Sequence, residues 1–371
     1  MNKKYSELAE LFRSEKTDEE ILDFLLNYHK NDIADMMAGM TEEERKRLYH
    51  LLGAQKVAEI FKYIEEPRKY IRELSVESAA RVISEMDSDD AVDLLEDLDP
   101  EEKEQIVRML DEDAKKDVKM LLSYDEEEIG SCMTTNYICI PENLTIRQAM
   151  SELVKQAGEN DNIMTIYVVD EKGVFAGAID LKDLIRAREN AHLEDLVLKS
   201  YPYVTDHEKI DDCMDRILDY AEDSIPVLSE DKKILGVITS EDLIEMVDNE
   251  MGEDYAKLAG LTAEEDLKEP TLQSMKKRLP WLIILLFLGM AVSSVVGLFE
   301  NVVAVLPIVI CFQSLVLDMA GNVGTQSLAV TIRVLMDENL TGKQKFQLVV
   351  KEVKTGSLNG ALLGIMALLC L

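Results

Sequence analysis

The spacing of hydrophobic and polar positions in roughly the first 125 residues is typical of α-helices. A twelve-residue pattern recurs there as MDSDDAVDLLED, LDPEEKEQIVRM and LDEDAKKDVKML, with Asp87, Asp99 and Asp111 at equivalent places. An aspartate directly before a helix can accept hydrogen bonds from the free amides of the first turn, so each is expected to cap a helix. We therefore predict an all-α domain over residues 1–130, an array of short helices that forms a superhelix.

The pattern changes near Met133, where helical and strand-like stretches begin to alternate. TIRQAMSELVKQ predicts a helix, MTIYVVDEKGVFAGAID predicts two strands around a turn, and LKDLIRA predicts a second helix. The same order returns in KIDDCMDRILDYAEDSIPVLSEDKKILGVITSEDLIEMV. We predict two tandem α/β units, residues 131–196 and 197–247, stacked on each other because each alone has little core.

A long acidic helix follows, in the segment SEDLIEMVDNEMGEDYAKLAGL, and residues 248–270 are expected to link the α/β units to the last part of the chain. Like charges three and four residues apart destabilise a helix by a few tenths of a kcal/mol per pair. A bound cation would neutralise them, and a solvated helix face is the alternative. The acidic residues at these spacings are Asp242, Glu245, Asp248, Glu250, Glu253 and Asp254.

The last part of the chain, residues 271–371, reads as an α-helical transmembrane domain. Leu279–Leu298 is a stretch of 20 residues without a charge, long enough to cross a bilayer. A second span is expected within Val302–Met336 and a third from Gly356. Basic residues precede the first span and follow the second, which predicts that both flanks and the acidic region are cytoplasmic. We expect a multi-pass protein of the cell membrane. The basic residues are Lys276, Lys277, Arg278, Lys343, Lys345, Lys351 and Lys354.

Charge is distributed unevenly between these parts. The net charge is −33, and residues 1–270 hold 32 basic and 68 acidic side chains, a net of −36. A region this acidic repels nucleic acid and anionic lipid and concentrates cations, although it also serves solubility. The five cysteines form no CxxC pair and the four histidines show no metal-ligand spacing, so neither a zinc site nor a disulfide framework is indicated.

Polar side chains interrupt the predicted second span at GNVGTQS. Asp318, Asn322 and Thr325 lie at i, i+4 and i+7, and Gln326 follows Asn322 by one turn, so all lie on one side of a helix. Carboxylate and amide oxygens suit hard ions such as Mg²⁺, which predicts a cation path. A helix–helix contact through small residues and amides is the alternative, because Gly321 and Gly324 would let another backbone approach.

The order of these parts resembles the MgtE family of magnesium transporters, in which the paired α/β units are CBS modules. The resemblance rests on MDSDDAVDLLEDL, YDEEEIGSCMTTNY, GVITSEDL, RLPWLIILLFLG and GNVGTQSLAVTIR. It implies a homodimer with a pore on its axis, and Mg²⁺ as both cargo and regulator. Cytosolic Mg²⁺ would bind between the N domain, the CBS modules and the linking "plug" helix, and would close the pore.

The resemblance also implies individual roles. The metal ligands would be Asp89, Asp93, Asp211, Asp242, Glu245, Glu250, Glu253 and Asp254, and the pore-lining residues would be Asp318, Gly321, Asn322 and Gln326. Three departures stand out. Ala221 replaces an acidic residue of the second CBS module, beside Asp219, Glu222 and Asp223. Asp318 stands where the family has an uncharged residue. The family has five spans, with a pore aspartate in the fifth, so a chain that ends in its third span is expected to be a fragment.

A membrane-tethered CBS sensor without transport activity is the competing interpretation. GVITSED resembles the CBS nucleotide motif, in which a hydroxyl and a carboxylate hold ribose, and ATP is the candidate ligand. The first module has Asp180 where the hydroxyl is expected, and the polar second span argues against a simple anchor. The chain contains no GxxxxGK[ST], GxSxG or HExxH motif, so we expect no enzyme and passive ion flow.

Overall fold

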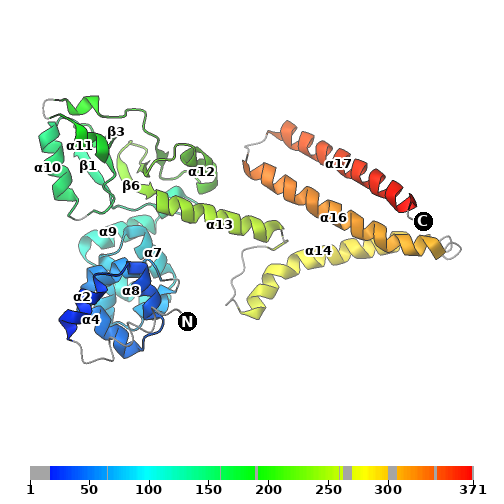
Figure 1. Ribbon diagram of the computed structural model, residues 1–371, viewed down its shortest axis with the longest axis horizontal. Helices are drawn as coiled ribbons and strands as arrows, with labels where there is room; N and C mark the ends of the chain where they lie inside the picture. The colour runs from blue at the N-terminus through cyan, green and yellow to red at the C-terminus, as the bar shows by residue number, and fades with distance from the viewer. Residues whose placement is uncertain are drawn as a thin grey trace. The chain divides into compact units, whose positions relative to one another are not determined.

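The computed structural model describes residues 17–64, 66–158, 160–188, 191–258, 260–261, 270–299, 307–337 and 341–369. The chain separates into two compact units, Met1–Ile244 and Glu245–Leu371, which are described one at a time. Figure 1 shows the helical N-terminal part of the first unit in blue to cyan and its α/β part in green.

The N-terminal part is the predicted array of short helices. The helices are α2 (Asp18–Leu25), α3 (Lys30–Met37), α4 (Glu42–Phe61), α5 (Pro67–Ile71), α6 (Val76–Ser84), α7 (Ser88–Glu96), α8 (Pro100–Met109) and α9 (Glu112–Leu121). Helices two apart in the chain lie against each other, with α4 on α6, α6 on α8 and α7 on α9. This stacking of short helices buries apolar side chains from each one, as in repeat proteins.

The twelve-residue pattern marks the helix starts correctly, because α7, α8 and α9 begin directly after Asp87, Asp99 and Asp111. Asp111 Oδ1 accepts the amide of Ala114 at 2.9 Å, which confirms the predicted cap. Asp87 makes no capping hydrogen bond, so that prediction is wrong at the level of the side chain. Its carboxylate contacts residues outside its own helix instead, and Asp99 pairs with Arg68 at 2.8 Å.

The α/β part contains two modules of the same order, which confirms the predicted repeat. The first module contains β1 (Ile138–Pro141), α10 (Ile146–Gln156), β2 (Thr165–Val169), β3 (Phe175–Asp180) and α11 (Leu181–Arg186), and the second contains β4 (Val204–Thr205), α12 (Ile210–Leu218), β5 (Ser224–Leu228), β6 (Ile234–Thr239) and α13 (Ser240–Leu258). In each three-stranded sheet the first strand is parallel to the second and the third is antiparallel to it. The sequence analysis did not predict the first strand of either sheet.

The two modules are joined by reciprocal backbone pairing at equivalent places. Thr134, before the first strand of the first module, pairs with Val237 of β6, and Leu198, before the first strand of the second, pairs with Ala178 of β3. A glycine precedes each pairing residue on the strand. A Cβ on Gly177 would lie 2.6 Å from the Leu198 oxygen, and one on Gly236 would lie 2.7 Å from the Thr134 oxygen. Only glycine permits this approach, so both glycines are required for the stacking that the sequence predicts.

The second unit contains the end of α13 and the helices α14 (Thr271–Gly297), α16 (Pro307–Asp337) and α17 (Gly342–Leu369). The long acidic helix that the sequence predicts is α13, which starts at Ser240 and is continuous with the second module. Of the described helices, α14 alone meets the length and hydropathy expected of a membrane span, with a mean hydropathy of 2.4. The helix after α16 starts at Gly342, earlier than the span predicted from Gly356, so the basic residues that follow α16 are helical.

Candidate functional site

Two half-buried carboxylates from distant parts of the chain lie close enough in the first unit for the charge of one to raise the pKa of the other. Asp89 lies in the first turn of α7, and Asp242 lies in the first turn of α13, where β6 ends. Burial, followed by the charge of Asp242, raises the pKa of Asp89 to about 8. Burial also raises the pKa of Asp242. The buried Oδ1 of Asp89 has no hydrogen-bond partner in the part of the chain that the structure describes.

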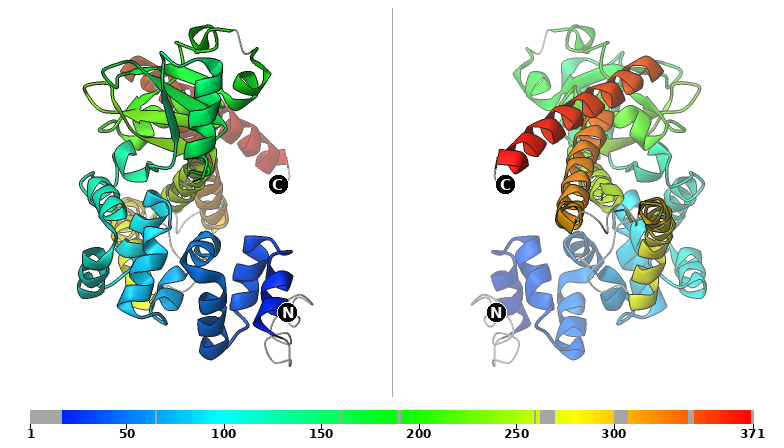
Figure 2. Two further views of the ribbon diagram at one scale, coloured as in Figure 1. Left: turned by 90° about the vertical axis from the view of Figure 1, so that its left-hand side faces the viewer. Right: turned by 90° about the vertical axis from the view of Figure 1, so that its right-hand side faces the viewer.

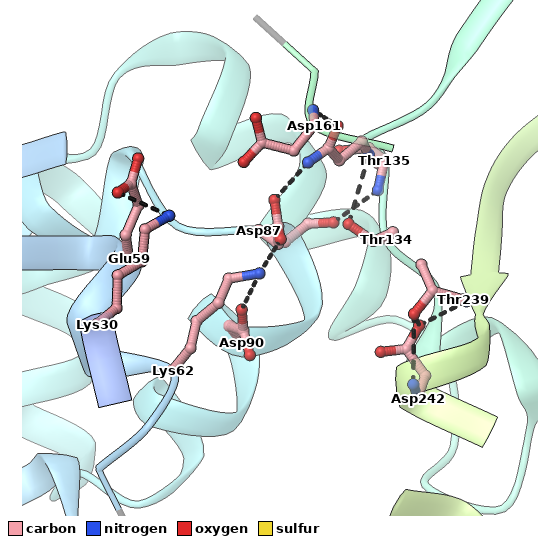
Figure 3. Close-up of polar contacts among 12 residues, drawn as sticks. Lys30, Glu59, Lys62, Asp87, Asp90, Thr134, Thr135, Asp161, Thr239 and Asp242 are labelled. Atoms are coloured by element: carbon pink, nitrogen blue, oxygen red, sulfur yellow. Dashed lines mark hydrogen bonds and ion pairs between the residues drawn. The ribbon is translucent and has the colours of Figure 1, made fainter. Parts of the chain in front are cut away.

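Asp242 is held in place by the residue at the end of β6. Thr239 donates its backbone amide and its hydroxyl to Asp242 Oδ2, at 2.7 and 2.8 Å (Figure 3). The amide of Asp242 returns a hydrogen bond of 3.3 Å to Thr239 Oγ1. This reciprocal capping fixes one carboxylate oxygen at the helix start, as a capping box does.

The N-terminal part contacts the start of the first module beside this carboxylate pair. The amide of Thr135 donates to Ser88 Oγ at 2.9 Å, and the Thr135 hydroxyl donates to Asp117 Oδ2 at 2.9 Å. Asn136 Nδ2 donates to Asp87 Oδ1 at 2.8 Å. α7 therefore carries both one member of the carboxylate pair and the residues that dock on the CBS-like modules.

The polar residues of the membrane part lie on one face of α16, as the sequence predicts. Asp318, Asn322, Thr325 and Gln326 are exposed, and Asn322 Nδ2 donates to Asp318 Oδ2 at 3.4 Å. The opposite face, with Val323, Ser327 and Thr331 half-buried, lines a cavity of about 540 Å³ between α16 and α17.

The glycines of α16 do not make the close helix contact that the sequence suggested. A Cβ on Gly321 or Gly324 would meet no described atom within 4 Å, whereas one on Gly356 would lie 3.3 Å from Val323 Cγ1. The close approach of α16 and α17 therefore occurs at a glycine of α17. No described helix covers the polar face of α16.

Comparison with known proteins covers every part of the chain described above. Family models match the MgtE intracellular N domain at residues 28–127, CBS domains at 127–190 and 193–249, and a divalent cation transporter domain at 313–371. Magnesium transporter MgtE of Enterococcus faecalis (strain ATCC 700802 / V583) is 38% identical over 369 residues, which are 98% of this chain and 81% of the relative. This chain belongs to the MgtE family.

Other MgtE proteins agree over the first two thirds of the chain. The Bacillus subtilis (strain 168) transporter is 31% identical over 66% of this chain and 54% of its own length. The crystal structure of the soluble part of a magnesium transporter has a TM-score of 0.64 at 30% identity, and covers 67% of this chain and 98% of that one. The cytosolic domain of the Mg²⁺ channel MgtE in complex with ATP has a TM-score of 0.59 at 26% identity, and covers 65% of this chain and 99% of that one.

The structure brings together only some of the metal ligands that the MgtE resemblance implies. Asp89 and Asp242 meet, and Asp93 is exposed one turn further along α7. Asp211 is exposed on α12 and Glu245 is exposed on α13. The side chains of Glu250, Glu253 and Asp254 lie outside the described residues, although their backbone is part of α13. Within the described residues, no three His, Cys, Asp or Glu side chains form a metal-binding group.

Two features of the MgtE-type site were missed from the sequence. Burial raises the pKa of the Cys132 thiol, and the nearby charges of Asp93, Asp242 and Asp89 raise it further, so this cysteine stays protonated beside the carboxylate pair. Lys62 forms ion pairs with Asp87 and Asp90 at the same contact (Figure 3). The lysine directly follows α4, and nothing in its local sequence distinguishes it from a solvated residue.

The turn that contains Ala221 has an unusual backbone conformation. Ala221 has a φ of 50°, in the left-handed region that few non-glycine residues adopt. Burial and the charge of Asp180 raise the pKa of the neighbouring Glu222. The carboxylates of Glu222 and Asp180 are therefore near each other. Glu222 is one of the acidic residues beside Ala221, which replaces an acid that the MgtE resemblance leads us to expect.

Proposed function

We propose that this chain acts as a channel-like transporter of Mg²⁺ that closes when cytosolic Mg²⁺ binds its acidic N-terminal region. The observation that carries the proposal is the half-buried pair of Asp89 and Asp242, in which Asp89 Oδ1 is buried without a hydrogen bond among the described residues. Two carboxylates in a poorly solvated place are destabilising unless a proton or a cation neutralises them. Mg²⁺ commonly keeps several waters and is held by one or two carboxylates, so this pair fits a hydrated ion.

The gating role follows from where the pair lies. A cation between Asp89 and Asp242 would hold α7 on the start of α13, and thereby favour one arrangement of the N domain, residues 1–130, on the CBS modules, 131–196 and 197–247. The plug segment, 248–270, would carry that arrangement to the membrane domain, 271–371. Each ion shifts such an equilibrium only by its differential affinity, and a nearly complete switch needs about 5.5 kcal/mol. We therefore assign further weak cation contacts to Asp93, Asp211, Glu245, Glu250, Glu253 and Asp254.

The membrane domain would provide the ion path. Polar side chains exposed to lipid are costly, so the face of α16 with Asp318, Asn322 and Gln326 should face protein or water. A second copy of the chain across a two-fold axis would cover it, with Gly321 allowing close approach, and would form the pore of a homodimer. The basic flanks support an N domain in the cytoplasm and a multi-pass membrane protein. A divalent ion that moves inward across the membrane would gain about 4.6 kcal/mol for each 100 mV of membrane potential.

The proposal is tested in a bacterial strain that lacks its own Mg²⁺ transporters and carries the natural gene of this protein. We expect growth at low external Mg²⁺, and excess Mg²⁺ accumulation when Asp89 and Asp242 are both changed to asparagine. A strain that makes the protein in its membrane but gains no Mg²⁺ uptake would support the non-transporting CBS sensor instead. If the double variant accumulates no more Mg²⁺ than the wild type, the carboxylate pair has no part in closing the pore.

ATP is the second ligand that we propose, because an MgtE cytosolic domain with the same fold has been crystallised with it. Thr239 and Asp242 supply the hydroxyl and carboxylate of the motif at the end of β6. Asp242 Oδ2 already accepts two hydrogen bonds from Thr239, so Oδ1 would have to bind both Mg²⁺ and the ribose of ATP. Calorimetric titration with ATP, with and without Mg²⁺, tests this assignment. No heat at millimolar ATP would exclude it.

A further inference from the structure

Lys62 is positioned within the acidic contact between the N domain and the CBS modules. Its ammonium forms ion pairs with Asp87 and with Asp90 Oδ2, the latter at 3.2 Å (Figure 3). The Lys62 side chain is 33% exposed, and those of Asp87 and Asp90 are 25% and 30% exposed. Burial lowers the pKa of Lys62, but the two carboxylates outweigh burial and raise it, so the lysine is charged at any physiological pH.

One of these ion pairs is linked directly to the docking contact. Asp87 Oδ2 pairs with Lys62 and Asp87 Oδ1 accepts from Asn136 Nδ2, and the carboxylate accepts no capping hydrogen bond from its own helix. Asn136 is fixed in turn by the amide of Asp161, which donates to Asn136 Oδ1 at 3.0 Å. A continuous chain of charge-assisted and amide hydrogen bonds therefore runs from the end of α4 to the start of the first CBS module.

The charge of Lys62 also reaches the carboxylate pair. The positive charge of Lys62 lowers the pKa of Asp242, and it lowers that of Asp90, in both cases against the larger effect of burial. Asp90 is itself subject to the charges of Asp87 and Asp242. The ammonium thus lies among the carboxylates whose mutual repulsion opposes docking.

We propose that Lys62 is a tethered cation of the sensor, which neutralises part of the acidic contact and keeps the N domain partly docked when Mg²⁺ is scarce. This inference rests on the proposed function, in which Mg²⁺ acts at the same contact. A covalently attached charge acts at every Mg²⁺ concentration, whereas a bound ion acts only above its dissociation constant. Lys62 therefore sets how much of the docking is left for Mg²⁺ to control, and acts as a positioning residue.

The same N domain offers a matched control. Lys30 pairs with Glu59 at 2.9 Å and is 46% exposed (Figure 3). Both are lysine–carboxylate pairs between helices of the array, but among the described contacts the Lys30 pair involves only residues of the N domain. Exposed pairs of this kind contribute little to stability. Lys30→Met therefore removes one charge of the same type without touching the docking contact.

The test is hydrogen–deuterium exchange of the Thr135 amide, which donates to Ser88 Oγ across the docking contact. The full chain in detergent is compared with Lys62→Met, Lys62→Arg and Lys30→Met, first in EDTA and then in about 10 mM Mg²⁺, the scale of weak carboxylate sites. In EDTA we expect exchange about tenfold faster in Lys62→Met than in the wild type, equivalent to about 1.4 kcal/mol. Mg²⁺ should restore most of the protection, and Lys62→Arg and Lys30→Met should resemble the wild type.

Two results would overturn the inference. Equal exchange of Lys62→Met and wild type in EDTA would reduce Lys62 to a surface ion pair. Loss of protection that Mg²⁺ does not restore would make it a structural residue rather than a substitute for the ion. Failure of the proposed function gives a different pattern, in which the wild-type amide does not respond to Mg²⁺ at all while the comparison in EDTA still reports on Lys62.

Discussion

Asp242, at the start of α13, raises the pKa of Asp89 on α7, although 152 positions of sequence separate the two carboxylates. α7 belongs to the helical N domain, drawn in blue to cyan in Figure 2, and α13 directly follows β6 of the second CBS module, which is drawn in green. The pair therefore forms only when the N domain is docked, and a cation that bound there would report that docking.

Asp89→Asn should remove the stabilisation by Mg²⁺. A ligand at 100 times its dissociation constant stabilises the folded state by about 2.7 kcal/mol, and the variant should lose most of this gain because it keeps only one carboxylate of the pair. The thermal midpoint of the chain, measured with and without Mg²⁺, checks this. Asp97→Asn is the matched control, because Asp97 is exposed at the end of the same helix. Equal Mg²⁺ shifts in all three proteins would contradict the prediction.

Gly236→Ala should separate the two CBS modules. The new Cβ would lie 2.7 Å from the Thr134 oxygen, so the backbone pairing of Thr134 and Val237 would have to open. We expect a loss of about 1–3 kcal/mol in the free energy of unfolding, the usual cost of overpacking. Urea unfolding measures it. Gly158→Ala is the control, with 3.5 Å to its nearest backbone oxygen, and a similar loss there would contradict the steric explanation.

The contact between His207 and Glu128 should depend on pH, because the histidine titrates. The hydrogen bond to Glu128, 2.9 Å from Nδ1 to Oε1, raises the pKa of His207, and Asp206 adds to it. A raised histidine pKa means that the contact stabilises the fold fully below the unfolded pKa, and that this stabilisation is lost as pH rises through the folded pKa. Glu128→Gln should lower the pKa of His207, measured from its ring resonances by NMR. An unchanged titration would show that Glu128 does not hold this imidazole.

The polar face of α16 should be accessible to water in the assembled protein. In a variant whose native cysteines are serine, Asn322→Cys should react with a water-soluble thiol reagent, and Val323→Cys should not. Asn322 is on the exposed polar face, whereas Val323 packs at the cavity beside α17. Equal labelling of both positions would contradict the assignment of that face to an ion path.

The hydrophobic periodicity of the sequence correctly predicted those structural features that depend on a single segment of the chain. The starts of α7, α8 and α9, the paired modules and the polar side of α16 follow from helical and strand spacing within single segments. The strands β1 and β4 were missed because they are short, with 4 and 2 residues, and are stabilised by pairing with a later strand. Such strands have little pattern of their own.

The candidate site was predicted only in part, because burial decides the behaviour of its acids. Asp89 and Asp93 are one helical turn apart, yet Asp89 is largely buried against the α13 start and Asp93 is exposed. Lys62 could not be found from sequence, since its partners lie 25 and 28 positions away, in and next to the first turn of α7. The burial of Asp89 and the ion pairs of Lys62 both depend on contacts between segments that are distant in the sequence.

The most direct test of the Mg²⁺ site is proton release on binding. With a pKa of about 8, Asp89 is mostly protonated at pH 7, and an ion that binds its carboxylate must displace that proton. Titration calorimetry with Mg²⁺ at pH 7, in two buffers of different ionisation enthalpy, counts the protons released. We predict about 0.9 proton per ion bound at this site in the wild type, falling to near zero for Asp89→Asn. Mg²⁺ binding with no proton release from the wild type would contradict a cation site at Asp89 and Asp242.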